Sequence, residues 1–405
     1  MLCPYAVSYD IASRVFPPRH GSMTDVATPS RVTVRPVTTG KDRSRFIDLP
    51  YRLYEGHPYW IAPLRMDQAK AIDPKKNPFF EHGEIELFLA EDEGGEVVGR
   101  IAAIVNGMHL EKYADNNAFF GFLECVDDYA VAEALLDAAT GWLKERGYTG
   151  VRGPVNPSMN DTAGLLIEGF DREPSILMPY NPPYVVDFLE RYGFERAMTM
   201  WAYYVHEAYV NKDKLRRGAD IVMRRNPGLT LRSLDTDRFW EDAAAVLRIY
   251  NEAWSQNWGH VPMTEHEFEH LAKDLKQVIE PELVFILEKD GEPVAFSISI
   301  PNLNQALKHV PSGRLFPTGL PKMLAYAKLG AVYELRMPLM GVLPEYHGRG
   351  FDAVLIDATI QDGLRAGYDA CEMSWVLEVN TPLVNSLDKL GAVKDKTYAM
   401  VEKAL

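Results

Sequence analysis

The sequence predicts an α/β protein in which one structural module occurs twice, and two observations carry this prediction. Residues 87–106 (LFLAEDEGGEVVGRIAAIVN) and residues 284–302 (VFILEKDGEPVAFSISIPN) share one pattern. Each is an apolar run, an acidic turn that contains glycine and a second apolar run, which is typical of a β-hairpin. In both cases two helix–strand units follow in the same order, so we expect two copies of one module.

The repeated units are two helix–strand pairs, at 134–150 and 355–370 and at 181–197 and 380–395. In the first pair, apolar residues recur at three- and four-residue spacing, and Gly147 or Gly367 ends the helix before a strand. In the second pair, Asn181 or Asn380 suits the helix N-cap and a proline follows in the first turn. The matching order of all these segments supports a duplication.

The spacing between matching segments changes along the chain, which indicates one insertion in each copy. The first copy gains residues around 151–180, and the second gains residues around 303–330. Insertions of this size in a repeated scaffold often carry function. The alternative is that both are loops without a function of their own.

The composition excludes several classes of protein. With 405 residues, 47% of them hydrophobic, the chain is long enough for two domains. No apolar run approaches the roughly 18–20 residues of a membrane span. The formal net charge of −14 opposes nucleic-acid binding, which needs a basic surface. We therefore expect neither an integral membrane protein nor a nucleic-acid-binding protein.

The chain start and the cysteines favour a cytoplasmic protein. Residues 1–30 lack the pattern of a secretory signal, and we expect them to form a disordered tail. Three widely spaced cysteines match neither a disulfide framework nor a zinc knuckle, which fits a reducing compartment. These residues are Cys3, Cys125 and Cys371.

The stretch PEYHGRGFDAVL (344–355) lies between a predicted strand at 331–342 and a predicted helix that starts near Phe351. The first N–H groups of a helix are unpaired and carry partial positive charge. Gly348 and Gly350 would let an anionic ligand approach the main chain closely. The turn is therefore a candidate pyrophosphate site, although a plain glycine turn before a helix is the common alternative.

This strand, the sequence V-L-P-E-Y-x-G-R-G, the following helix and strand, and the later Asn and short helix ending in Gly resemble the GNAT (Gcn5-related) acyltransferase superfamily. The resemblance implies acyl-CoA binding at the turn and acyl transfer to an amine. It also implies a tandem GNAT fold, each half a mixed, mostly antiparallel sheet with helices on both faces. The expected domains are 31–205, a degenerate copy, and 235–405, which carries the acyl-CoA turn, joined by a linker region at 206–234.

The resemblance implies the donor contacts residue by residue. A backbone N–H near Val342 or Leu343 would meet the thioester carbonyl. The other expected coenzyme-binding residues are His347, Gly348, Arg349, Gly350, Phe351 and Asn380. Two positions depart from the family pattern. His347 stands where the family has Arg or Gln, and Asp352 stands where it has Gly or Ala. A carboxylate at Asp352 disfavours a neighbouring phosphate, which makes Arg349 the main compensating charge. In the first copy the acidic ECVDDYAVAE replaces this turn, so we expect that half not to bind coenzyme.

The catalytic groups stay open. Leu387 and Leu189 occupy the position where the family commonly has a tyrosine acid. The candidate bases are Glu334, Glu372 and Glu378, and a water chain or an ordinary structural role for each is the alternative. Because Glu372 and Glu378 are an even number of residues apart, the alternation of side chains along a strand predicts that they share one face.

Two segments have the composition of an acceptor site. The stretch YNEAWSQNWGHVP (250–262) contains Trp254, Asn257 and Trp258, and the two tryptophans would be core residues if the stretch were helical. In and after the first insertion an unusual density of polar residues supports substrate binding. These residues are Asn160, Asp161, Asn181 and Tyr184.

The segment HEFEH (266–270) matches the zinc motif H-E-x-x-H. Glu269 adds a charge unusual in such helices, no third ligand is evident, and Phe268, Leu271 and Leu275 would form the inner face of an amphipathic surface helix. We therefore expect no metal.

The stretches GPVNPSMND, MPYNPPY, NEAWSQNWG and SWVLEVN are similar to a bacterial tandem-GNAT group that includes bacterial ceramide synthases. That resemblance implies N-acylation of a long-chain base, with acyl-CoA or an acyl carrier protein as donor. The apolar second insertion would then roof an acyl chain or lie on the inner face of the membrane, unless it merely caps the core. The alternatives are a short-chain acetyltransferase acting on a soluble amine and a non-catalytic acyl-CoA-binding protein.

Overall fold

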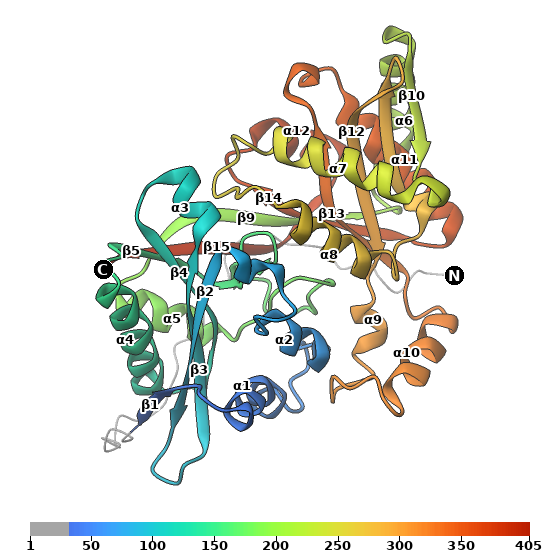
Figure 1. The fold of residues 1–405 in the computed structure, drawn as a ribbon. Helices are drawn as coiled ribbons and strands as arrows, with labels where there is room; N and C mark the ends of the chain where they lie inside the picture. Colours follow the sequence, from blue (N-terminus) through green and yellow to red (C-terminus); the bar gives the residue numbers. More distant parts are fainter. Residues whose placement is uncertain (1–31) are drawn as a thin grey trace, which may run out of the picture.

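The computed structural model describes residues 32–405 (Figure 1). The expected tail at 1–30 and Cys3 lie outside the described residues. The elements of the first half are β1 (Thr33–Pro36), α1 (Gly40–Leu53), α2 (Arg65–Ala71), β2 (Gly83–Glu91), β3 (Val97–Asn106), α3 (Gly107–Tyr113), β4 (Asn117–Cys125), α4 (Tyr129–Glu145), β5 (Gly150–Gly153), β6 (Val155–Asn156), β7 (Thr162–Ala163), β8 (Leu165–Glu168), α5 (Pro183–Tyr192) and β9 (Glu195–His206).

The second half repeats this order. Its elements are α6 (Lys212–Arg225), β10 (Leu229–Ser233), α7 (Phe239–Ala253), α8 (Glu265–Leu275), β11 (Val284–Lys289), β12 (Glu292–Pro301), α9 (Asn304–Leu307), α10 (Gly319–Lys328), β13 (Glu334–Val342), α11 (Phe351–Ala366), β14 (Ala370–Leu377), α12 (Thr381–Leu390) and β15 (Val393–Ala404). The predicted hairpins, helices and closing strands are all present in both copies. The mixed, mostly antiparallel α/β fold is confirmed.

All the long strands belong to one sheet, and the two halves exchange their last strands. The order along the sheet is β1-β2-β3-β4-β5-β15-β9-β14-β13-β12-β11-β10. Thus β15, the end of the second copy, pairs with β5 of the first copy, while β9 of the first copy pairs with β14 of the second. Tyr398 and Met400 of β15 accordingly lie in a core cluster of the first half, and Tyr203 of β9 lies in one of the second.

Strand alternation in the first half explains why helices cover both faces of its sheet. On β2, Phe88 and Ala90 join a core cluster with α4, whereas Leu87 and Leu89 join a cluster with Phe46 of α1. Neighbouring residues of a strand point to opposite faces, so this apolar run is buried on both sides. Figure 1 shows α4 and α1 on either side of these strands.

Helix ends follow from the capping residues, with one difference from the prediction. Gly367 and Gly391 end α11 and α12 in the left-handed conformation, at φ +95° and +89°. Asn380 caps α12 by accepting the N–H of Leu383 at 3.4 Å. In the first copy, however, Pro182 is the N-cap of α5, and the Asn181 side chain instead bonds to the main chain of Leu166 on β8.

The expected linker at 206–234 contains regular structure. Helix α6 packs against α11, and β10 pairs antiparallel with β11 at the edge of the sheet. The division of the chain into domains at these boundaries stays a prediction, because the exchanged strands join the two halves through a continuous sheet.

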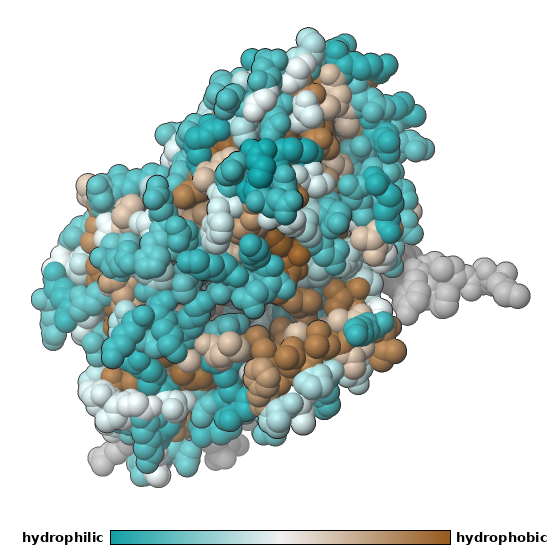
Figure 2. All heavy atoms as spheres, turned by 45° about the vertical axis from the view of Figure 1, so that its right-hand side comes forward, coloured by the Kyte–Doolittle hydropathy of each residue, from teal (hydrophilic) through white to brown (hydrophobic). Residues whose placement is uncertain are grey.

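The two insertions take different forms. Residues 151–180 contain the short strands β6, β7 and β8, whereas residues 303–330 contain α9 and α10. Helix α10 buries only Gly319. Figure 2 shows brown, apolar surface at the lower right, on the side where Figure 1 places α10.

Cys125 and Cys371 are buried free thiols. Between residues 32 and 405, none of the helices is long and apolar enough to cross a bilayer.

Candidate active site

The main-chain pairing of β13 and β14 stops partway along β13, and we call this divergence the fork. The two strands pair in parallel only over Glu334–Met337 and Ala370–Met373. Pro338 follows at once and has no N–H to donate to a ladder. Beyond it, the register of β14 against β9 also shifts between Met373 and Val376. The fork therefore leaves peptide groups of β13 without a strand partner on that side.

The peptide groups at the rim of the fork can be assigned from the neighbouring strand. The Leu343 N–H donates to Val294 O at 2.9 Å, so it points toward β12, and the residues before it alternate. Met340 and Val342 therefore face the fork. The Met340 carbonyl accepts from Trp254 Nε1 at 3.2 Å, and the Val342 carbonyl pairs with His347 Nε2 at 2.9 Å. Of the two predicted thioester contacts, only the Val342 N–H faces the fork, and the prediction for Leu343, which is 3% exposed, is wrong.

The glycine turn has the conformation that close ligand approach requires. Gly348 and Gly350 have φ values of +72° and +82°, which side-chain-bearing residues rarely adopt. A Cβ at Gly350 would lie 2.8 Å from a Val222 methyl of α6, whereas a Cβ at Gly348 would meet open space. No side chain caps the N-terminus of α11. The turn thus presents unpaired N–H groups at the start of a 16-residue helix.

Aromatic packing fixes this turn, and the Arg349 charge remains exposed. Phe351 is 1% exposed and stacks on Tyr346, with ring centroids 5.4 Å apart, so only its main chain can contact a ligand. The Arg349 guanidinium carbon lies 5.2 Å from the Tyr346 ring centre. Asp352 is half-buried in the first turn of α11. The structure therefore brings together the predicted residues 347–351.

A basic helix beside this turn is a feature that the sequence analysis missed. Helix α6 (KDKLRRGADIVMRR) carries six lysines and arginines and two aspartates. Arg216 lies 3.9 Å from Asp357 of α11, while Arg217 and Arg225 are exposed. Because Val222 packs at Gly350, this charge lies near the candidate phosphate site. The signal was present as a basic run, but it fell in the expected linker.

Glu372 is part of a buried ionic cluster. It is 2% exposed, and its carboxylate accepts from Ser374 Oγ at 2.8 Å and from Lys396 Nζ at 3.4 Å. Arg336 also donates to Ser374 Oγ, at 3.1 Å. Burial by itself lowers the pKa of Lys396, but Glu372 and Asp395 outweigh it and raise this pKa above its usual value. These contacts favour a structural role for Glu372 over that of a proton acceptor.

The other two candidate bases lie at opposite ends of the diverging strands. Glu334, at the paired end, accepts from Tyr204 Oη at 2.6 Å and from Asn302 Nδ2 at 3.2 Å. Burial, followed by Glu334, raises the pKa of Tyr204. Glu378 is exposed after β14, and its carboxylate accepts the Thr199 N–H at 3.0 Å.

The expectation that Glu372 and Glu378 share a face is wrong. Glu372 pairs with Tyr204 on β9, and the Glu378 N–H donates to Thr199 O, five residues away on the same strand. The register shift in β14 inserts an additional residue, which reverses the alternation. Glu372 is consequently buried and Glu378 exposed.

The two predicted acceptor segments meet in the structure. Tyr250 of α7 donates to Asn160 Oδ1 at 2.7 Å, and Asn160 Nδ2 donates to Val261 O at 3.2 Å. The Tyr250 and Trp254 rings lie 4.7 Å apart, and Trp254 reaches the fork through Met340. A chain of direct contacts therefore runs from the insertion of the first copy to the fork of the second. Tyr250 was not predicted, although it begins the quoted polar–aromatic stretch.

The two tryptophans have separate surroundings. Trp254 ends α7 and packs on the core of the second half, whereas Trp258 lies in the following loop and packs on the first half. The Arg152 guanidinium carbon lies 4.9 Å from the Trp258 ring centre. Asn257 is half-buried and its carbonyl accepts the His260 N–H at 3.2 Å. The loop therefore bridges the two halves and is not a continuation of the helix.

Two titratable groups beside Tyr250 have shifted pKa values. Asp161 is solvent-exposed, but desolvation by nearby protein atoms raises the pKa of its carboxyl to about 7. Ser158 opposes that rise by hydrogen bonding, and Glu267 adds to it. His260 is 6% exposed and neither ring nitrogen has a hydrogen-bond partner. Burial, followed by Lys112, lowers the pKa of His260 to about 4, so its ring is neutral at pH 7.

Two predicted substrate residues make structural contacts, and their part in substrate binding stays a prediction. Asn181 is 8% exposed and holds β8, as described above. Tyr184 donates to Cys125 O at 2.7 Å. Leu387 and Leu189, at the positions of the family's tyrosine acid, are buried core residues with exposures of 0% and 1%.

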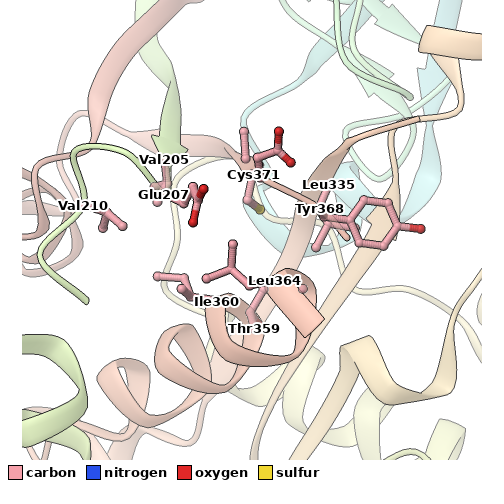
Figure 3. A pocket seen from close by; sticks show the side chains of 12 residues that line it. Val205, Glu207, Val210, Leu335, Thr359, Ile360, Leu364, Tyr368 and Cys371 are labelled. Atoms are coloured by element: carbon pink, nitrogen blue, oxygen red, sulfur yellow. The ribbon is translucent and has the colours of Figure 1, made fainter. Parts of the chain in front are cut away.

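A small pocket between β14 and α11 is distinct from the fork (Figure 3). Its volume is about 30 Å³, which is roughly the room for one water molecule. Cys371 lies at its wall, and burial raises the pKa of this thiol to about 12. The pocket is too small for an acyl or amine substrate.

The H-E-x-x-H residues make other contacts. Glu267 caps α8 and pairs with His82 Nε2 at 3.0 Å, while His266 Nδ1 pairs with Glu81 at 2.5 Å. Phe268 and Ala272 form the buried face of α8. Within residues 32–405 no group of three or more His, Cys, Asp and Glu side chains is placed to hold a metal ion.

Comparisons with known proteins place the chain among acyltransferases. No family model matches the sequence. It is 38% identical over 388 residues to the bacterial ceramide synthase of Caulobacter vibrioides, covering 94% of this chain and 99% of that protein. It is 35% identical over 377 residues to protein YghO of Escherichia coli, covering 92% and 95%.

Solved structures with low identity share the fold. A tandem GNAT protein from the clavulanic acid biosynthesis pathway matches 92% of this chain and 98% of its own, with a TM-score of 0.54 and 14% identity. A GCN5-related N-acetyltransferase from Sphaerobacter thermophilus matches 93% and 96%, with a TM-score of 0.51 and 12% identity. The chain therefore has a tandem GNAT fold, belongs to the family of bacterial ceramide synthase and is an N-acyltransferase.

Proposed function

We propose that this protein transfers a long-chain acyl group from acyl-CoA to the amine of a long-chain base, forming a ceramide-like amide. The observation that carries the proposal is the contact chain from Asn160 through Tyr250 and Trp254 to Met340 O. It joins an acceptor side, built by both halves, to the fork at which a thioester would lie. Similarity to the Caulobacter ceramide synthase over 94% of the chain supports the choice of a long-chain base.

The donor would bind along the second half. The N–H groups at Gly348, Gly350 and Phe351 suit a pyrophosphate, and the open space beside Gly348, where a Cβ would meet no protein atom, leaves room for a ligand to approach. Arg349 and the exposed arginines of α6 offset the carboxylate of Asp352 in the first turn of α11. The Val342 N–H is then the candidate donor to the thioester carbonyl, and Asn380 would contact the coenzyme from the start of α12.

The acceptor would enter beside Asp161 and Trp254. An amine is cationic near neutral pH, and a carboxylate attracts it, but acylation needs the neutral amine. We infer that Asp161 accepts the proton, because it follows Asn160 on the acceptor side, next to Tyr250, and because the raised pKa of its carboxyl makes it a better base than an ordinary aspartate. Asn160, Asn257 and Trp258 would shape the surrounding wall.

The chemistry is then a balanced acyl transfer. The amine nitrogen attacks the thioester carbon and forms the C–N bond, while the Val342 N–H stabilises the oxyanion. The proton from nitrogen goes to Asp161, directly or through water. The C–S bond breaks and the CoA thiolate leaves, taking its proton from solvent because Leu387 offers none.

Glu334 and Glu378 remain alternative proton acceptors. Glu334 already accepts two hydrogen bonds, and Glu378 accepts one from the main chain of β9. A water molecule could connect either carboxylate to the amine. Turnover by the Asp161→Asn variant at the wild-type rate would return the role to one of them.

A calorimetric titration with palmitoyl-CoA, acetyl-CoA and CoA in parallel tests the donor side, followed by mass-spectrometric detection of the amide formed with sphinganine. We expect tight binding of palmitoyl-CoA, weakened by Arg349→Ala. Arg365→Ala is the matched control, because Arg365 is exposed at the other end of the same helix.

Each other outcome points elsewhere. A preference for acetyl-CoA with turnover would support a short-chain acetyltransferase. Binding without turnover on any amine would support a non-catalytic role, which the changes at His347, Asp352 and Leu387 favour. No binding of the three would direct the search to acyl carrier protein as donor.

A further inference from the structure

The segment 303–333 differs in charge from the rest of the protein. It contains Lys308, Arg314, Lys322 and Lys328 but neither aspartate nor glutamate, in a chain with a formal net charge of −14. Lys308 pairs with Glu173 at 3.3 Å. The other three are exposed and make no ion pair in the described chain. Three of the four positive charges of this segment therefore lack an ion-pair partner among residues 32–405.

The same segment exposes large apolar side chains. Phe316, Leu324 and Leu329 are 73%, 48% and 80% exposed. Met66 of α2, which is 61% exposed, lies beside Phe316 because the two line one pocket. We call these four residues with Arg314, Lys322 and Lys328 the α10 face. Figure 2 shows brown surface interrupted by teal at this side of the molecule.

Helix α10 gains little from the rest of the protein. It buries only Gly319, and its one aromatic contact is the stacking of Tyr326 on His309, with ring centroids 3.5 Å apart. At 10 residues it is far shorter than the roughly 20 that cross a bilayer. Apolar side chains flanked by lysines instead suit a helix that lies in the interface, with the lysine ammonium groups at the headgroups.

A pocket at the edge of the α10 face suits an anionic headgroup. It has a volume of about 450 Å³ and is lined by Met66, Leu315, Phe316, Arg65 and Arg314, with Asp48 on its wall. Asp48 pairs with Arg65, so Arg314 is the uncompensated charge. Burial, followed by the nearby Arg314, lowers the pKa of Arg65. The combination of an apolar wall and guanidinium groups matches a lipid phosphate above its acyl chains.

We propose that the α10 face docks this protein on an anionic phospholipid bilayer and that the Arg65–Arg314 pocket takes a lipid phosphate. The inference rests on the proposed function in one respect: a long-chain base and its amide product reside in membranes. Docking would let the acceptor reach the enzyme from the bilayer without crossing water.

Vesicle flotation of the full chain tests the docking, using phosphatidylcholine vesicles with and without phosphatidylglycerol. We expect binding only to the anionic vesicles, and less of it at high salt. Lys322→Gln with Lys328→Gln should lower the partition coefficient about 30-fold. This factor corresponds to about 1 kcal/mol of membrane attraction lost for each lysine. Leu324→Ser with Leu329→Ser should lower it at least about tenfold through lost apolar burial.

Two controls make the result specific. Trp240→Ser and Val393→Ser remove side chains that are 46% and 49% exposed elsewhere on the surface, and we expect them to bind vesicles normally. Turnover of a short-chain amine with a short acyl-CoA in free solution should be unchanged in the α10-face variants.

The proposal is overturned if the wild type does not bind anionic vesicles or if the α10-face variants bind like the wild type. It is also overturned if these substitutions instead abolish a dimer or the binding of acyl carrier protein, since the face would then have another occupant. Failure of the proposed function looks different: no amide forms with any donor and amine, while vesicle binding still depends on the α10 face.

Discussion

The buried contact between Glu372 and Lys396 yields a prediction that separates a structural from a catalytic carboxylate. Glu372→Gln keeps the shape of the side chain but removes its charge, leaving Lys396 and Arg336 buried with less compensation. Breaking one side of a buried pair costs about 3–5 kcal/mol, and because Asp395 remains beside Lys396 we expect the lower end, about 3 kcal/mol. The free energy of unfolding should fall by that amount.

Urea unfolding followed by tryptophan fluorescence measures this loss. Trp375, whose ring centre lies 5.7 Å from the Arg336 guanidinium carbon, reports on the cluster. The matched control is Glu378→Gln, an exposed carboxylate on the same segment that should change stability by about 0.5 kcal/mol or less. Adding Lys396→Met to Glu372→Gln should recover part of the lost stability. Removing both charges of a buried ion pair costs less than leaving one of them without its partner.

One result would refute the reasoning. If Glu372→Gln unfolds at the same urea concentration as the wild type but forms no amide, the carboxylate acts in the reaction and does not serve mainly to balance Lys396. A loss of stability with turnover preserved at a temperature where the variant is folded supports the structural role.

Further predictions concern the reaction and the turn. The raised pKa of Asp161 keeps it protonated below about pH 7, so kcat/KM should rise as the pH increases through about 7. The Asp161→Asn variant should lose this rise of the pH profile. An identical rise in the variant would exclude Asp161 as its source. Gly350→Ala should weaken CoA binding and destabilise by about 1–3 kcal/mol through its positive φ and the contact with Val222. Gly348 also has a positive φ, but a Cβ there would meet open space, so Gly348→Ala should lower CoA affinity and stability less than Gly350→Ala does. A CoA titration and thermal unfolding of the two variants in parallel measure this difference. His266→Ala and a chelator should both leave amide formation unchanged, and a loss in either case would revive the zinc interpretation.

Local sequence patterns predicted the helices, strands and turns. The orientation and contacts of individual side chains depend on tertiary pairing, which local patterns do not contain. The hairpins, the glycine turn and the closing helices depend on neighbouring residues, so the sequence contains their signals. The faces of Glu372 and Glu378 depend on a register shift against β9, which no local period reveals. The role of Asn181 likewise depends on Leu166, which lies on a separate strand.

The candidate site was predicted in pieces. Asn160 and Trp254 were each noted for local composition, but their connection through Tyr250 follows from the packing of the first insertion on α7. The sequence predicts that an N–H near Val342 or Leu343 meets the thioester, and only the hydrogen bond from Leu343 to Val294 on β12 shows that Leu343 faces away. The charge of α6 was visible as a basic run, yet its position beside the turn depends on a helix–helix contact.

The exchange of β9 and β15 has a consequence for synthesis of the chain. The strand that completes the sheet beside β5 consists of residues 393–404, which are synthesised after every other strand of this sheet. Until then β5 presents an unpaired edge, and exposed edges recruit other strands. The first half therefore has to wait for residues 393–404, and a chain cut short before Val393 would leave both the edge of β5 and the side of β9 that pairs with β15 open to aggregation.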